Sequence, residues 1–175
     1  YCDFLKKYQR KTVQRTLRNF KGCSLLALDM GLGKSIIALS IIQELNKKAL
    51  IVCPASLKYN WLAEIEKFWP EKTTYICSGQ KPPKTIFTKF DVFICNYEIL
   101  QYWWKYFVSC GIKILIADEP TANLDKLTTK EIIDLLKKIN DELLAKSEKI
   151  VKVGYCQYSE SSQKIQIMNS KGLNL

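Results

Sequence analysis

Apolar residues fall along the chain in two alternating patterns. Short unbroken apolar runs, typical of strands that are buried on both faces, occupy residues 24–28, 49–53, 75–77, 91–95 and 113–117. Segments with apolar residues at helical spacing occupy residues 4–20, 56–69, 97–108 and 128–145. A further helix is expected to run from the loop at residues 29–35 to about residue 46, and two later apolar runs, residues 150–153 and 165–168, are candidates for final strands.

This alternation predicts an α/β fold, in which helices cover both faces of a mostly parallel sheet. The length of 175 residues is enough for one such domain. We assign residues 1–153 to it and treat the more polar residues 154–175 as a C-terminal tail without an assigned fold.

Helical spacing also predicts which side chains of three helices are buried and where one helix begins. The expected apolar stripe of the first helix consists of Phe4, Leu5, Tyr8, Val13 and Leu17. In the helix at 56–69, Ser56 is expected to cap the N-terminus and Pro70 to end it. The aromatic residues of the helix at 97–108 are better explained as core than as a surface that stacks on nucleic-acid bases; they are Trp103, Trp104, Tyr106 and Phe107.

Charge and cysteine usage narrow the class of protein. A formal net charge of +10 favours a polyanionic partner, nucleic acid before an anionic membrane, although a lysine-rich surface also serves solubility alone. The seven cysteines form no CxxC pair and the chain has no His, which speaks against a zinc site. Cys53 and Cys95 lie in apolar runs, so we expect free thiols and a reducing intracellular location, cytoplasmic or nuclear. No apolar run reaches the roughly 18–20 residues that span a bilayer, and no membrane partner is expected.

The strongest chemical signal is the glycine-rich segment Gly31-Leu32-Gly33-Lys34-Ser35, placed between a predicted strand and a predicted helix. Backbone N–H groups at such a helix N-terminus can point at phosphate oxygens. Lys34 would neutralise the β- and γ-phosphates, and the Ser35 hydroxyl would bind Mg²⁺. The longer form of this pattern has Gly where the chain has Leu28, so only the shorter G-x-G-K-[ST] form is present. Its position between strand and helix favours nucleotide binding over a plain glycine turn.

A pair of carboxylates, Asp118 and Glu119, follows the apolar run at residues 113–117. Asp118 would hold Mg²⁺, mostly through water, and Glu119 would orient or deprotonate the attacking water. An acidic strand end in solvent is the simpler alternative, but the glycine-rich loop upstream favours a site. The predicted catalytic set is therefore Lys34, Asp118 and Glu119, with ATP and Mg²⁺ as ligands and with the carboxylates facing the loop.

Several segments resemble motifs of the Swi/Snf branch of the superfamily-2 helicase-like ATPases. Residues 29–35 (DMGLGKS) resemble its motif I, and residues 5–10 (LKKYQR) are similar to the upstream segment in which a Gln reads adenine. Residues 50–56, with Trp61 and Glu64 after them, resemble motif Ia. Residues 93–98 resemble motif Ib, and Asp118 with Glu119 matches motif II. Together these matches cover residues 4–119 in order.

The resemblance implies a P-loop NTPase lobe with the RecA-like three-layer α/β/α fold, in which ATP hydrolysis is coupled to movement along double-stranded DNA. It implies nucleotide contacts from Gln9, Gly31, Leu32, Gly33, Lys34 and Ser35, and Mg²⁺ contacts from Ser35 and Asp118. It makes Lys58, Asn60, Asn96 and Tyr97 candidates for DNA contact, although a solvated lysine and a helix N-terminus explain them nearly as well. The family also has a second RecA-like lobe, which we expect as a partner of these residues; without its arginine, hydrolysis should be slow.

The resemblance changes after Glu119. Residues 115–140, and above all residues 118–125 (DEPTANLD), resemble the Walker B and D-loop segment of ABC-type ATPases, so the lobe is ABC-like from about residue 120. The ABC signature and its switch His are missing, and so is the Ser/Thr-Gly-Thr motif expected of the helicase family near residue 150. We interpret the chain as a hybrid joined at the shared Asp-Glu pair. An ABC-type nucleotide-binding module and a nucleotide-binding fragment without turnover stay open as alternatives.

Overall fold

The computed structural model describes residues 4–19, 23–26, 28, 31–85, 88–119, 126–145 and 151–155. Its elements follow one another in the order α1 (Lys7–Asn19), β1 (Cys23–Leu26), α2 (Lys34–Leu45), β2 (Ala49–Cys53), η1 (Ala55–Leu57), α3 (Lys58–Phe68), β3 (Thr74–Ile76), β4 (Val92–Asn96), α4 (Tyr97–Cys110), β5 (Ile114–Ala117), α5 (Lys126–Ala145) and β6 (Val151–Tyr155).

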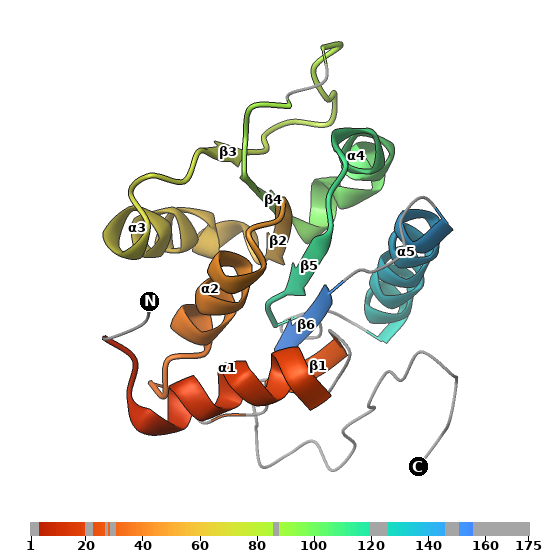
Figure 1. The fold of residues 1–175 in the computed structure, drawn as a ribbon. Coiled ribbons are helices and arrows are strands. Elements are labelled where there is room, and N and C mark those ends of the chain that lie inside the picture. The colour runs from red at the N-terminus through yellow and green to blue at the C-terminus, as the bar shows by residue number, and fades with distance from the viewer. Residues whose placement is uncertain are drawn as a thin grey trace.

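The six strands form one sheet in the order β1-β6-β5-β2-β4-β3, and every neighbouring pair is parallel. Parallel neighbours require crossover connections, which place helices on the faces of the sheet. Helices α1, α2 and α3 lie on one face, and α4 and α5 lie on the other (Figure 1). The predicted three-layer α/β fold with a parallel sheet is therefore confirmed.

Two apolar cores lie against the two faces of the sheet. Side chains alternate along a strand, so in β2 the residues Ala49, Ile51 and Cys53 pack toward α2 and α3. Leu50 and Val52 belong to the opposite core, with α4 and α5. All five residues of β2 and all five of β4 are buried, which explains the unbroken apolar runs at residues 49–53 and 92–95; the last residue of β4, Asn96, is buried but polar.

Helix α2 begins at the glycine-rich loop and ends at a left-handed residue. Its middle, from Ile37 to Ile42, is buried throughout, because α2 lies between the sheet and neighbouring helices. Asn46 closes the helix with φ 46° and ψ 49°, and its N–H bonds to the Ile42 carbonyl. Asn tolerates this conformation better than most residues with a Cβ.

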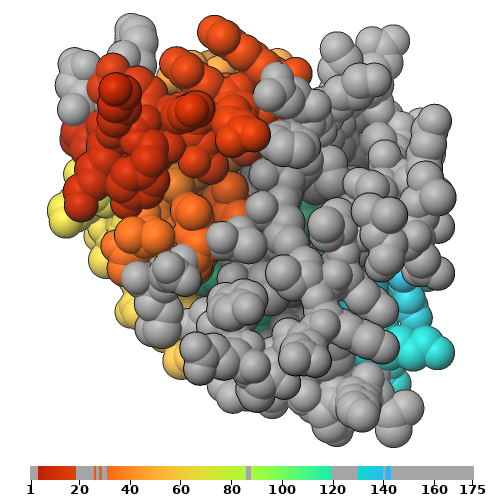
Figure 2. Space-filling model, turned by 90° about the horizontal axis from the view of Figure 1, so that it is seen from below, coloured from red at the N-terminus to blue at the C-terminus, as the bar shows by residue number. Residues whose placement is uncertain are grey.

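The predicted apolar stripe of the first helix is confirmed in part. Leu5 and Val13 are buried and Leu17 packs against the core, as expected, but Phe4 is 48% and Tyr8 37% exposed. Gln9 and Thr16 take the inward positions instead, because this face of α1 meets polar backbone of the glycine-rich loop as well as the apolar side of α2. The red atoms of α1 lie at the surface beside the orange atoms of α2 (Figure 2).

Two predictions about helices meet different outcomes. Ser56 does not cap α3: it lies in the 3-10 turn η1, and α3 begins two residues later behind Leu57. The turn forms because the Leu57 N–H bonds to the Pro54 carbonyl. In α4 the core interpretation holds, since Trp103, Tyr106 and Phe107 are buried in contact with one another.

The C-terminal part of the described chain completes the sheet. Strand β6 lies between β1 and β5 and continues to Tyr155, two residues past the expected end of the domain. The strand candidate at 165–168 and the segment at 120–125 lie outside the described residues. Cys53, Cys77, Cys95 and Cys110 are buried free thiols, as their apolar surroundings predict. No described helix combines the length and the apolar character that a membrane span needs.

Candidate functional site

The glycine-rich loop turns through two left-handed residues before α2 begins. Gly31 and Gly33 both have φ near +78°, a backbone region that favours glycine. Lys34 is the first residue of α2, and its Nζ donates to the Leu28 carbonyl at 2.7 Å, across the mouth of the loop. The lysine side chain therefore folds back over the loop and holds its two ends together.

The start of α2 is a suitable cradle for phosphate. The N-cap residue is Gly33, which has no side chain to satisfy the first N–H groups of the helix. The helix dipole adds a partial positive charge at the same end, next to the ammonium of Lys34. These donors match the chemistry of a triphosphate.

Gln9 lies directly against the loop. Its Nε2 donates to the Leu32 carbonyl at 3.2 Å, and its Oε1 accepts the Lys6 N–H at 2.9 Å. The Tyr8 hydroxyl also donates to the Leu32 carbonyl, at 2.9 Å. The contact is so close that a Cβ on Gly33 would lie 2.5 Å from Gln9 Nε2.

Asp118 follows β5 and is held from three directions. Its backbone N–H donates to the Val52 carbonyl at 2.8 Å, which extends the β2–β5 ladder by one bond. The indole N–H of Trp61 donates to Asp118 Oδ2 at 2.9 Å. The Tyr97 hydroxyl donates to the Asp118 carbonyl at 2.8 Å. The carboxylate is thus fixed in place before any ligand is considered.

The sheet order brings the loop and the carboxylates to the same edge. Strands β1 and β5 are parallel and separated only by β6, so the segments that follow them leave the sheet at its carboxyl edge. A cavity of about 440 Å³ lies there. It is lined by Ser35, Leu57, Asn60, Trp61, Ala63, Glu64, Lys67 and Asp118. A hydroxyl and a carboxylate that share one cavity form a donor set suited to Mg²⁺.

Burial and neighbouring charge act in opposite directions on the two carboxylates. Burial raises the pKa of Asp118, and the Trp61 hydrogen bond and then the positive charge of Lys34 lower it in part. Burial likewise raises the pKa of Glu119, the negative charge of Asp118 raises it further, and Lys34 lowers it. Glu119 also has φ +50°, an uncommon conformation for a residue with a side chain. Lys34 therefore acts electrostatically on both carboxylates.

The four DNA-contact candidates do not form one exposed surface. Asn60 is exposed near the start of α3. The Lys58 ammonium donates to Asn96 Oδ1 and to the Cys77 carbonyl, each at 3.0 Å, and Asn96 donates to Glu98. Asn96 is only 7% and Tyr97 only 5% exposed. Their side chains are engaged inside the lobe, which argues against direct contact with DNA and leaves Asn60 as the accessible candidate.

The contacts of Trp61 and Tyr97 with Asp118 do not follow from the sequence. The sequence indicates Trp61 only through the motif Ia resemblance and makes Tyr97 a candidate for DNA contact. The residues of these pairs are 57 and 21 positions apart in the chain. Local spacing holds no signal for such pairs.

Two family models match parts of this chain. A family model described as SNF2-related domain matches residues 8–145, which is more than half of the chain. A second model, described as PmbA/TldA metallopeptidase central domain, matches residues 122–175, less than a third of the chain and mostly outside the described residues. The ABC-like character of residues 115–140 stays a prediction.

Two curated relatives show the extent of the similarity. The chromatin-remodeling ATPase INO80 of Arabidopsis thaliana is 31% identical over 139 residues, which cover 67% of this chain and 9% of that protein. The ATP-dependent DNA helicase DDM1 of the same plant is 31% identical over 130 residues, which cover 59% of this chain and 17% of that protein. The chain thus spans less than a fifth of either relative.

Solved structures agree in fold. The SWI2/SNF2 ATPase core of Sulfolobus solfataricus in complex with dsDNA matches with a TM-score of 0.67 and 24% identity, over 87% of this chain and 31% of that one. A second structure, described as the SWI2/SNF2 ATPase core domain of the same organism, matches with a TM-score of 0.62. The SNF2-related model matches more than half of the chain, and the chain carries the glycine-rich cradle and the carboxylates at one sheet edge. The chain therefore belongs to the SNF2-related domain family.

Proposed function

We propose that this chain is the first ATP-binding lobe of a helicase-like ATPase that moves along double-stranded DNA. The observation that carries the proposal is the shared cavity of Ser35 and Asp118, with the charge of Lys34 acting on Asp118 and Glu119. A phosphate cradle and a carboxylate pair at one sheet edge are the parts that phosphoryl transfer to water requires.

Nucleotide binding follows from the loop and its neighbours. The first N–H groups of α2 and the Lys34 ammonium would bind the β- and γ-phosphates. Gln9 lies against the Leu32 carbonyl, beside the loop, and would read the base by exchanging one of its present backbone hydrogen bonds. Binding would require Lys34 to exchange its bond with the Leu28 carbonyl for phosphate oxygens.

Hydrolysis would use the two carboxylates in different roles. The Ser35 hydroxyl and Asp118 would hold Mg²⁺, which supplies charge neutralisation at the phosphates when bound. Glu119 would orient the attacking water and accept its proton. Its raised pKa makes it a better proton acceptor than an ordinary surface Glu.

We also propose that the lobe binds double-stranded DNA and that DNA binding is coupled to ATP hydrolysis. The relatives are described as chromatin-remodeling ATPases and DNA helicases, and the structural neighbour is described in complex with dsDNA. The net charge of +10 supports a polyanionic partner. Full turnover should also need a cationic group from a second lobe, because such a group accelerates phosphoryl transfer by about 10³–10⁵.

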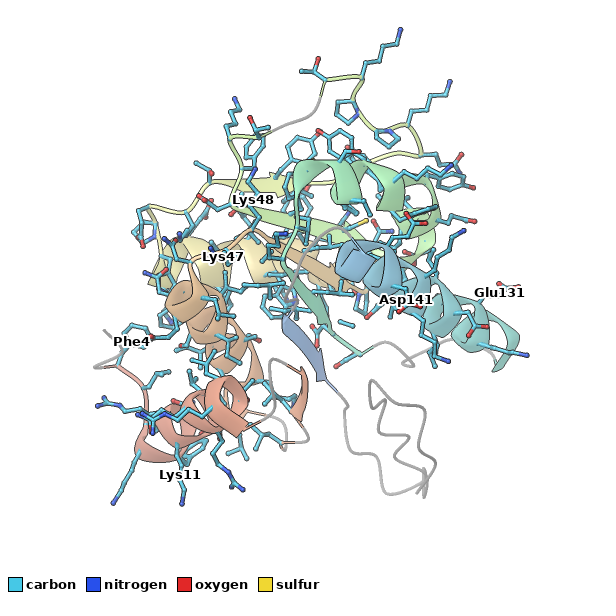
Figure 3. All side chains as sticks on the ribbon, turned by 45° about the vertical axis from the view of Figure 1, so that its right-hand side comes forward. Phe4, Lys11, Lys47, Lys48, Glu131 and Asp141 are labelled. Carbon is cyan, nitrogen blue, oxygen red and sulfur yellow. The ribbon has the colours of Figure 1, made fainter. Side chains whose placement is uncertain are left out.

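Nucleotide binding by Lys34→Ala tests the proposal. The variant should bind MgATP at least about tenfold more weakly than the unchanged chain, because a charge-assisted contact to phosphate is lost. Lys47→Ala is the matched control: Lys47 lies just beyond the opposite end of α2 and is exposed (Figure 3). Equal MgATP affinity of Lys34→Ala and the unchanged chain would refute the site. The ATP hydrolysis rate with and without duplex DNA then separates a DNA-dependent ATPase from a lobe that only binds nucleotide.

A further inference from the structure

Two buried aromatic side chains converge on Asp118. Trp61 of α3 donates its indole N–H to the carboxylate oxygen Oδ2 at 2.9 Å. Tyr97 of α4 donates its hydroxyl to the backbone carbonyl of the same residue at 2.8 Å, and the hydroxyl also lies 3.2 Å from the Val52 carbonyl. One donor therefore fixes the side chain of Asp118 and the other fixes its backbone.

The two donor side chains are buried, while Asp118 itself lines the cavity. Trp61 is 3% and Tyr97 5% exposed, so water competes weakly for either donor and the bonds are strong for their type. An indole has a single N–H, so it can engage only one carboxylate oxygen and leaves the other to different ligands. Asp118 is thus oriented while part of its carboxylate stays available at the cavity.

The two donors are also tied to each other through the N-terminal ends of their helices. Trp61 lies three residues after Lys58, and Tyr97 directly follows Asn96. Lys58 Nζ donates to Asn96 Oδ1 at 3.0 Å, which joins the start of α3 to the start of α4. A displacement at either helix start would therefore move a donor that contacts Asp118.

We propose that Trp61 and Tyr97 are positioning residues that set the orientation of Asp118 toward Mg²⁺ and connect it to the starts of α3 and α4. This inference rests on the proposed function, because it assumes that Asp118 holds the metal of bound ATP. It assigns Tyr97 to the nucleotide site and not to DNA.

Phe substitutions at the two donors test the inference. Trp61→Phe and Tyr97→Phe should each weaken the apparent Mg²⁺ affinity of the ATP-bound chain by roughly tenfold, the usual effect of losing a partner of a metal ligand. ATP binding in EDTA should stay within about twofold, since the phosphate cradle is untouched. Trp69→Phe and Tyr106→Phe are matched controls: both residues are buried, and the Tyr106 hydroxyl donates to the Thr85 carbonyl. They should leave the Mg²⁺ affinity unchanged.

An isosteric variant separates the N–H from the volume of the indole. Replacement of Trp61 by 3-benzothienylalanine keeps the ring size and removes the donor, so it should lower the Mg²⁺ affinity as Trp61→Phe does. It also serves if Trp61→Phe does not fold. An isosteric variant with the Mg²⁺ affinity of the unchanged chain would overturn the inference for Trp61. Failure of the unchanged chain to bind MgATP would instead overturn the proposed function, so the two failures are distinguishable.

Discussion

The two glycines of the loop share a left-handed backbone conformation but differ in packing. Gly31 and Gly33 share a φ near +78°, but only Gly33 is crowded: an added Cβ would lie 2.5 Å from Gln9 Nε2 and 2.9 Å from Ile36 Cγ2. At Gly31 no atom of the described residues lies within 4 Å of such an atom. A substitution at Gly31 therefore tests the left-handed backbone alone, whereas a substitution at Gly33 also tests the contact with Gln9 of α1.

We expect Gly33→Ala to destabilise the chain more than Gly31→Ala. Both variants meet the cost of a left-handed alanine, about 1 kcal/mol. Only Gly33→Ala must also displace the Gln9 amide, which adds roughly 1–3 kcal/mol. Thermal unfolding without nucleotide measures the difference, at about 2–4 °C per kcal/mol for a chain of this size. Equal melting temperatures would contradict the close contact between Gln9 and the loop.

Asp118 is a residue whose ionised form is unfavourable in the fold. Its pKa is raised by burial above the ordinary value of 3.8, so the folded chain binds its proton more tightly than the unfolded chain. The resulting stability is present below that ordinary pKa and is lost as pH rises through the higher folded pKa. At neutral pH the Asp118 carboxylate therefore lowers the free energy of unfolding.

Asp118→Asn should consequently raise the melting temperature at pH 7, by about 2 °C or more. The gain should shrink as pH is lowered toward the ordinary pKa of Asp. Asp134→Asn is the control, because that carboxylate is 57% exposed on α5, where it pairs with Lys137 at 3.6 Å. A melting temperature of Asp118→Asn at or below that of the unchanged chain at pH 7 would show that its hydrogen bonds outweigh its burial.

Helix α4 shows how an element can present aromatic residues without forming a binding surface. Trp103 is buried, stacks on Phe107 at 5.9 Å and donates its N–H to the Gly79 carbonyl at 2.8 Å. Trp104 is half-buried, and the ammonium groups of Lys105 and Lys138 lie 5.5 and 4.7 Å from its ring centroid. Of these adjacent tryptophans, Trp103 thus belongs to the core, whereas Trp104 lies partly exposed beside two lysines.

We expect Trp103→Ala to lower the free energy of unfolding by about 3–5 kcal/mol, the usual cost of truncating a buried large aromatic residue. Trp104→Ala should cost much less, because its ring stays partly in contact with water. Denaturant unfolding of both variants measures this contrast. A small loss for Trp103→Ala would contradict its place in the core between α4 and the sheet.

At the scale of the whole molecule, the positive charge should show in the salt dependence of DNA binding. Even two phosphate contacts would reduce duplex affinity about tenfold between roughly 50 and 200 mM salt. Asn60→Asp places a negative charge at the accessible start of α3 and should weaken binding further. Gln101→Glu makes the same charge change at an exposed position of α4 and is the control. Binding that does not vary with salt, or equal effects of the two variants, would contradict DNA contact at α3.

Much of the fold and part of the site could be predicted because their signals are local. Unbroken apolar runs mark all of β2 and the first four residues of β4, since strands buried on both faces are mostly apolar. The glycine loop and the Asp118–Glu119 pair are short segments, so a few consecutive residues are enough to indicate their chemistry. The sequence by itself therefore determined the α/β class, the order of the elements and the candidate phosphate and metal groups.

Only the tertiary structure decided which distant residues meet. The position of β6 between β1 and β5, the contacts of Trp61 and Tyr97 with Asp118, and the burial of Asn96 join residues from separate elements. The exposure of Phe4 and the inward turn of Gln9 likewise depend on what α1 packs against. Periodicity along one segment reports which face of that segment is apolar, but the partner of a polar side chain is set by the packing of the whole chain.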